Sequence, residues 1–337
     1  MVDNTKDVLI YLDHNIIDKL TKSQFDAIFN HLSQERILPV YSDENLEEIH
    51  KSKGYENKSL SLLKELGAVH LRLEVVDYRF TGKAAFETTD PFEAYSKYIS
   101  NKEALPEFDY GLSGMLRKFY GGIEDKSFTE ILNLGADELV TELDKTLADL
   151  QSADDISEKD KIVTKELTAQ LKEIFPQFFS EMGKTLDSNM QAATPITQIE
   201  KIFSVGPKIL NNIKEPDVIK KIWAIIYKCM PANALTLEKF FGLTPDLYGY
   251  SDKRALSQVE KVNALYHQLN FLGYHRDANM NDQNRFNASF SDKTHAGYAI
   301  FCHYFMSMDE NLIMKTTAAY EYLGVFTKLI RLKKTVV

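Results

Sequence analysis

Acidic side chains recur where the predicted strands of a sheet end. Asp13 directly follows one apolar run, and Asp309 follows another near the far end of the chain. Carboxylates that converge on one sheet edge repel each other and raise each other's pKa values unless a positive charge lies between them. A divalent cation is the natural counter-ion, and an oxygen-only donor set favours Mg²⁺ or Mn²⁺ over zinc. The other acids at predicted element ends are Asp43, Glu44, Glu47, Glu48 and Asp292.

Each of these acids also has a purely structural interpretation. Asp13 and Asp292 are good N-caps for the helices predicted to follow them. Glu47 and Glu48 both suit a solvent-facing helix surface, and Asp309 suits a turn. The residues alone therefore leave the choice between Glu47 and Glu48 open, and only the convergence of several acids indicates a metal site.

The elements that position these acids begin with two apolar runs in the first quarter of the chain. Residues 7–12 and 36–42 are rich in apolar and β-branched side chains, which is typical of strands buried on both faces of a parallel sheet. A helix is expected over residues 44–53, and a short alternating strand over 69–73. Pro39 removes one hydrogen-bond donor from the second strand.

The same alternation of helices and strands returns after residue 290. We expect a helix over 293–303, a strand over 304–306, a helix over 312–322 and a last strand over 325–330. A strand, a helix and a second strand at these lengths form a right-handed βαβ unit. The two ends of the chain are therefore predicted to share one α/β sheet flanked by helices.

The middle of the chain has a different, mostly helical pattern. Asp90 is a good N-cap and Pro91 a good first residue, so a helix is expected to begin there. Apolar residues then recur at helical spacing over long stretches. The predicted organisation is a discontinuous domain made of residues 1–75 and 285–337, with residues 76–284 as a large α-helical insertion that we assign to no family.

Composition limits the classes of protein that fit this chain. The formal net charge of −9 argues against a protein that binds nucleic acid with its whole surface, although a local basic groove stays compatible with it. No apolar run is long enough to span a bilayer, so we expect no membrane partner. The two cysteines, Cys229 and Cys302, are far apart and show no metal-ligand spacing, which fits a cytoplasmic location.

The order of these motifs resembles the PIN-domain nuclease family. That family has a strand ending in L-D-x-N, a second strand followed by a helix that carries a glutamate, an aspartate that opens a late helix, and a strand that ends near T-x-D. The matching residues here are Leu12-Asp13-His14-Asn15, Pro39 to Ser42 leading to Glu48-Ile49, Asp292, and Ser307-Met308-Asp309. The resemblance covers residues 7–75 and 285–331, and its acid-then-aliphatic order favours Glu48 over Glu47.

What the resemblance implies is a metal-dependent endoribonuclease. Asp13, Glu48, Asp292 and Asp309 would hold one or two Mg²⁺ or Mn²⁺ ions, and Asn15 and Ser307 would hold the carboxylates in place by hydrogen bonds. RNA is the expected substrate, with DNA as an alternative. The insertion would select the substrate or mediate contact with a protein partner or a second copy of the chain.

Two alternatives accompany this prediction. The chain would otherwise be a non-catalytic PIN-like scaffold or interaction protein, which the acidic net charge mildly favours. His295 lies three residues after Asp292 and is a candidate for a phosphate contact, although a lone histidine is more often structural.

Overall fold

The computed structural model describes residues 8–22, 26–32, 37–76, 79–103, 110–153, 156–190, 195–231, 235–245 and 254–333. The chain divides into two compact units. The first consists of Met1–Lys102, Phe203–Asp277 and Ala288–Val337, and the second of Glu103–Ile202 and Ala278–Asn287. The predicted division at residues 75 and 285 stays a prediction.

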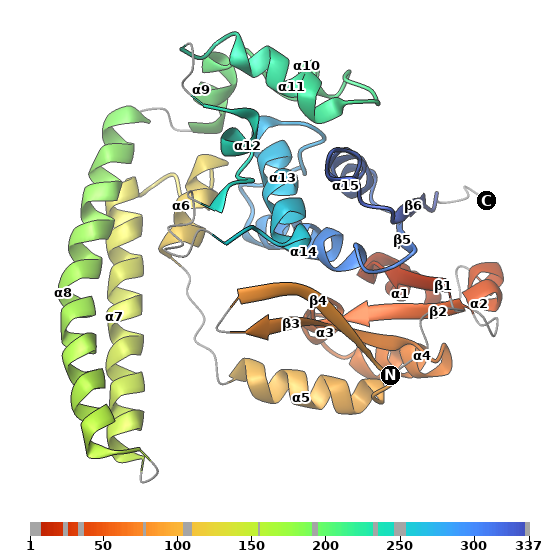
Figure 1. The fold of residues 1–337 in the computed structure, drawn as a ribbon, viewed down its shortest axis with the longest axis horizontal. Coiled ribbons are helices and arrows are strands. Elements are labelled where there is room, and N and C mark those ends of the chain that lie inside the picture. The colour runs from red at the N-terminus through yellow and green to blue at the C-terminus, as the bar shows by residue number, and fades with distance from the viewer. Residues whose placement is uncertain are drawn as a thin grey trace. The chain divides into compact units, whose positions relative to one another are not determined.

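The first unit contains a six-stranded, mostly parallel sheet with the strand order β4-β3-β2-β1-β5-β6 (Figure 1). All neighbouring strands are parallel except β3 and β4, which are antiparallel. The predicted α/β class is thereby confirmed. The strands are β1 (Val8–Leu12), β2 (Ile37–Ser42), β3 (Val69–Val76), β4 (Arg79–Glu87), β5 (Tyr304–Ser307) and β6 (Lys328–Arg331).

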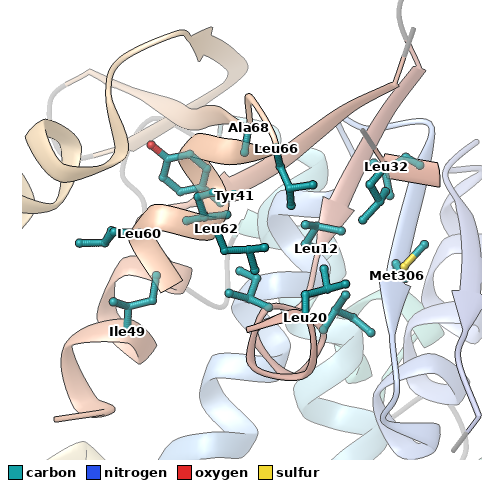
Figure 2. Close-up of a cluster of buried hydrophobic side chains, with 14 of the residues drawn as sticks. Leu12, Leu20, Leu32, Tyr41, Ile49, Leu60, Leu62, Leu66, Ala68 and Met306 are labelled. Atoms are coloured by element: carbon teal, nitrogen blue, oxygen red, sulfur yellow. The ribbon is translucent and has the colours of Figure 1, made fainter. Parts of the chain in front are cut away.

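Helices cover both faces of the sheet because β1 is apolar on both sides. Leu9 and Tyr11 pack with side chains of α13 (Gln258–Leu272) and α14 (Gln283–Ala299). Ile10 and Leu12, which point to the opposite face, pack with α1 (His14–Leu20), α3 (Asp43–Lys51) and α4 (Glu56–Glu65) (Figure 2). The buried strand predicted over residues 7–12 therefore lies between two layers of helices.

Several other predicted elements are confirmed within one or two residues. Strands 36–42 and 304–306 correspond to β2 and β5, and the helix expected from Asp90-Pro91 is α5 (Pro91–Glu103). Its start is fixed by the Asp90 carboxylate, which accepts a hydrogen bond from the Phe92 N–H at 2.9 Å. The helix expected over 312–322 is α15 (Glu310–Leu323).

One predicted element begins at the wrong residue, and one strand was not predicted. The helix expected to begin after Asp292 begins ten residues earlier, because Asp282 accepts a hydrogen bond from the Arg285 N–H at 3.0 Å and starts α14 there. Asp292 therefore lies within α14 and caps nothing. The segment expected to be helical from residue 76 also contains β4, which forms a hairpin with β3.

The helices between residues 207 and 240 form a third apolar cluster with α13 and α15. Leu210, Phe241 and several residues of α11 are buried in this cluster. These helices are α10 (Pro207–Leu210), α11 (Val218–Tyr227) and α12 (Leu237–Phe240). The first unit also contains α2 (Asp26–Leu32), which packs in the same cluster as α1 and α4.

The second unit is helical in the part that the structure describes. Its longest helices, α7 (Phe128–Ser152) and α8 (Glu158–Asn189), lie side by side as a hairpin (Figure 1). The shorter α6 (Leu112–Phe119) and α9 (Pro195–Ile202) contact each other. Among the described residues, no helix combines the length and the apolar character needed to cross a membrane.

Candidate active site

The candidate site lies where the strand order of the sheet reverses. From β1 the chain continues to β2 and β3 on one side, whereas β5 and β6 lie on the other. In open parallel sheets, ligands bind beyond the carboxyl ends of the strands at this point. Asp13 directly follows β1, and Asp309 comes two residues after β5. A hydrogen bond of 3.0 Å from the Asp13 N–H to the Met306 carbonyl joins the two strand ends.

The Asp13 carboxylate is almost completely buried and held by two polar side chains. Asn15 Nδ2 and Ser307 Oγ both donate hydrogen bonds to Asp13 Oδ2. Asn15 also donates to Ser307 Oγ at 3.2 Å and accepts a bond from the Met308 N–H at 3.1 Å. These contacts link the residues after β1 with those after β5, so the orientation of Asp13 is fixed by the sheet itself.

His295, on α14, lies between the acids of the site and is fully buried. Its Nε2 atom is 2.8 Å from Glu48 Oε2 and 3.9 Å from Asp13 Oδ1. Its Nδ1 atom is 2.7 Å from the Tyr11 hydroxyl, which is 2.6 Å from Ser42 Oγ. The imidazole is therefore clamped between β1 and α3, with one nitrogen directed at the two carboxylates.

Burial and these contacts shift the pKa values of Asp13, His295 and Glu48. Burial raises the pKa of Asp13 to about 6, although His295 partly offsets this effect. Burial alone would lower the pKa of His295, but the Glu48 and Asp13 carboxylates raise it to about 10. Burial also acts to raise the pKa of Glu48, yet the contact with His295 leaves it below its usual value. His295 is thus an imidazolium that donates to Glu48 at neutral pH.

A second buried cation, Lys315 on α15, interacts electrostatically with Asp292 and Asp309. Its ammonium group is fully buried, 2.7 Å from Asp277 Oδ2 and 2.9 Å from Asn270 Oδ1. It also lies 4.5 Å from the centre of the Tyr266 ring. Burial, and then the negative charges of Asp13, Asp277 and Asp309, raise the pKa of Asp292 well above its usual value, whereas Lys315 lowers it.

Of the four predicted ligands, the structure brings Asp13 and Glu48 together around His295, whereas Asp292 and Asp309 are linked to Asp13 through the effect of their charges on pKa. Asp13 and Glu48 share His295 as a partner. Burial raises the pKa of the Tyr266 hydroxyl, and the negative charges of Asp292 and Asp309 raise it further. Asp309 is also the N-cap of α15, where it accepts a bond from the Leu312 N–H at 2.9 Å. In the part of the chain that the structure describes, the only group of three donors that lie within 4.8 Å of one another is Asp13, Glu48 and His295.

Glu47, the neighbour of Glu48, makes different contacts. It accepts hydrogen bonds from Tyr98 at 2.7 Å and from Lys102 at 2.8 Å, and so joins α3 to α5. No local pattern in the sequence indicates Lys315 or Asp277 as members of the acidic region. His295 was predicted as a candidate for a phosphate contact, whereas the structure places it between Glu48 and Asp13.

A separate cavity lies away from this acidic region. A hollow of about 640 Å³ is lined by residues at the starts of β1, β5 and β6, including Val8, Tyr304 and Lys328. It therefore opens at the amino ends of the strands, opposite the carboxyl ends where Asp13 and Asp309 lie. Its lining is mainly apolar and offers no cluster of carboxylates.

Comparison of the chain with protein-family models, with curated proteins and with solved structures finds no match. The resemblance to PIN-domain nucleases accordingly stays a prediction.

Proposed function

We propose that the chain is a metal-dependent nuclease that hydrolyses phosphodiester bonds, with Asp13, Glu48, Asp292 and Asp309 holding Mg²⁺ or Mn²⁺. The observation that carries this proposal is the buried carboxylate of Asp13 at the switch point between β1 and β5, with donor atoms of Glu48 and His295 within 4.8 Å. RNA is the substrate class that the resemblance implies, and DNA is the alternative.

The donor set fits a divalent cation. Burial raises the pKa of Glu44 as well as those of Asp13 and Asp292, so several carboxylates in this region are poorly stabilised as anions. A nearby cation would stabilise their charged forms. Carboxylate oxygens are the donors that Mg²⁺ and Mn²⁺ take in proteins.

A divalent ion bound here would lower the pKa of an attacking water and offset the charge that develops on the leaving oxygen. The chain itself supplies the orientation of the ligands. Asn15 and Ser307 hold Asp13 in one rotamer, and Asp309 is held by its cap contact with α15. Because these contacts come from the ends of two adjacent strands, the carboxylates keep their positions without a flexible loop.

A non-catalytic scaffold is the second candidate, and a specific observation favours it. His295 and Lys315 already form buried ion pairs with Glu48 and Asp277. Such pairs partly neutralise the acids without any ion, as a structural network would.

A cleavage assay separates the two candidates. Single-stranded and structured RNA, and DNA of the same sequences, are incubated with Mg²⁺ or Mn²⁺ and with EDTA, using the wild type, Asp13→Asn and the control Glu47→Gln. Cleavage that needs metal, survives in Glu47→Gln and is lost in folded Asp13→Asn supports the nuclease. Absence of cleavage, together with no metal-induced rise in Tm, supports the scaffold.

We also propose a second copy of the chain as partner, through the α7/α8 hairpin. Five described apolar side chains on α8 are each more than half exposed, Ile162 among them. The other four form a stripe along one face of the helix: Val163, Leu167, Ile174 and Phe178. Exposed apolar stripes of this kind mark interaction surfaces. Their positions are symmetric about residues 170 and 171, so an antiparallel copy of α8 would place Val163 opposite Phe178 and Leu167 opposite Ile174.

We further propose that the chain acts in the cytoplasm, where cysteines stay reduced. Both Cys229 and Cys302 are free thiols.

A further inference from the structure

The contact of His295 with two carboxylates resembles a set of metal ligands in its spacing. Donor atoms that bind one ion at about 2.1 Å lie about 3 to 3.5 Å apart. The distances from His295 Nε2 are 2.8 Å to Glu48 and 3.9 Å to Asp13, and all three donor atoms lie within 4.8 Å of one another. Small side-chain shifts, together with release of the Nε2 proton of His295 to solvent, would therefore bring these atoms around a single ion.

The second nitrogen of His295 is arranged as it is in metal-binding histidines. Such histidines direct their other N–H at an oxygen acceptor, which fixes the orientation of the ring. Here Nδ1 is 2.7 Å from the Tyr11 hydroxyl, and Tyr11 in turn can donate to Ser42 Oγ at 2.6 Å. All three side chains are buried, so Nε2 can face only the carboxylates.

Two helices also meet in a way that supports this orientation. Glu44 and Glu48 are one turn apart on α3, and Ser291 and His295 are one turn apart on α14. Ser291 donates to Glu44 at 2.6 Å, while His295 contacts Glu48. The pairing of these faces fixes the register of α3 against α14, and with it the position of the His295 ring relative to Asp13.

We propose that Asp13, Glu48 and His295 bind one divalent first-row transition ion, and that His295 makes the site select such an ion over Mg²⁺. This inference rests on the proposed metal site and adds a ligand that changes its chemistry. Imidazole nitrogen is a good donor for first-row transition ions, whereas Mg²⁺ is bound through oxygen. Asp292 and Asp309 then remain as ligands for a second ion of the proposed site.

The test uses Mn²⁺ and Mg²⁺ as probes of the full chain without substrate. Titration calorimetry compares their affinities in the wild type, in His295→Gln and in the control His31→Gln, which changes an exposed histidine of α2. We expect Mn²⁺ to bind the wild type at least about tenfold more tightly than Mg²⁺ does. In His295→Gln this preference should largely disappear, and in His31→Gln it should persist.

Electron spin echo spectroscopy of bound Mn²⁺ gives a readout that needs no variant. A directly bound imidazole nitrogen couples to the ion, and labelling all histidines with ¹⁵N should change that coupling. Mn²⁺ that binds without nitrogen coupling, and with equal affinity in His295→Gln, would overturn the role of His295 and leave the proposed nuclease intact. If neither ion binds the wild type, the proposed function fails together with this inference.

Discussion

At the scale of single residues, the acidic region is held together by cations that belong to the protein. The sequence predicts converging carboxylates and assigns their compensation to a metal. In the structure, His295 pairs with Glu48 and Lys315 pairs with Asp277. Because a buried ion pair leaves an uncompensated charge when one partner is removed, each cation is expected to matter for folding before any ion binds.

Replacing Lys315 tests this expectation. Lys315→Met should lower the free energy of unfolding by about 3 to 5 kcal/mol, since the Asp277 carboxylate would lose its cation and keep only the hydrogen bond from Ser289. Urea unfolding followed by circular dichroism measures the change. The double variant Lys315→Met with Asp277→Asn should recover part of the loss. As a control, Lys220→Met removes a surface pair with Asp217 and should change little. A Lys315→Met protein as stable as the wild type would contradict the prediction.

Glu47 gives a pH-dependent prediction that separates it from Glu48. Burial alone would raise the pKa of Glu47, but Lys102, Tyr98 and Lys51 lower it from 4.5 to about 2. A carboxylate with a depressed pKa stabilises the fold above its unfolded-state pKa, and this contribution is lost as the pH falls through the folded-state value. Glu47→Gln should therefore cost about 2 kcal/mol at pH 7.

The difference between Glu47→Gln and wild type should shrink as the pH falls from about 4.5 to 2. Urea midpoints at pH 7, 4 and 2.5 measure it. A difference that stays constant over this range would show that Glu47 does not act through its charge. Cleavage activity in Glu47→Gln at pH 7 should match that of the wild type, because its contacts lie toward α5 and not toward His295.

At the scale of helices and strands, the N-cap of α15 combines a structural and a proposed functional role in Asp309. Asn caps helices as well as Asp does, whereas Ala does not. Asp309→Asn should therefore keep the stability of the wild type and lose metal-dependent cleavage. Asp309→Ala should lose the same activity and also about 1 kcal/mol of stability. Thermal unfolding and the cleavage assay measure both effects, and full activity in Asp309→Asn would exclude its carboxylate from the reaction.

Strong local signals explain which elements the sequence could predict. The five apolar residues of β1 and the Asp90-Pro91 start of α5 are both readable without tertiary information. The start of α14 was not, because Asp282 and Asp292 are equally good caps by type and only packing selects one. β4 was missed because Gly82 and two alanines weaken its strand pattern, and pairing with β3 supplies what its sequence lacks.

The same reasoning applies to the candidate site. Strand ends placed Asp13 and Asp309 at one edge of the sheet, because both follow readable apolar runs. Lys315 gave no such signal, since a lysine on a predicted helix is expected in solvent. Its burial depends on Asp277 and Asn270, which come from a different part of the chain. Long-range pairing of this kind cannot be read from local pattern.

At the scale of the whole molecule, the chain combines a sheet-containing unit that carries the acidic region with a helical unit that carries the exposed stripe on α8. A stripe of four apolar side chains on a long helix is wide enough to pair with another helix, and its symmetry about residues 170 and 171 suits an antiparallel copy of itself. Association and the acidic site then depend on different residues, so each can be removed without the other.

Sedimentation velocity at micromolar concentration measures the association. We expect the wild type to sediment as a dimer, and Leu167→Lys with Ile174→Lys to sediment as a monomer, because two pairs of like charges would then face each other across the two-fold axis. The control Ala169→Lys adds an exposed charge two residues from Leu167, outside the stripe, and should leave the dimer intact. Melting curves of the stripe variant should match those of the wild-type monomer at high dilution, since both side chains are already exposed in the single chain. A wild type that stays monomeric at all concentrations would remove the second copy as the partner of α8.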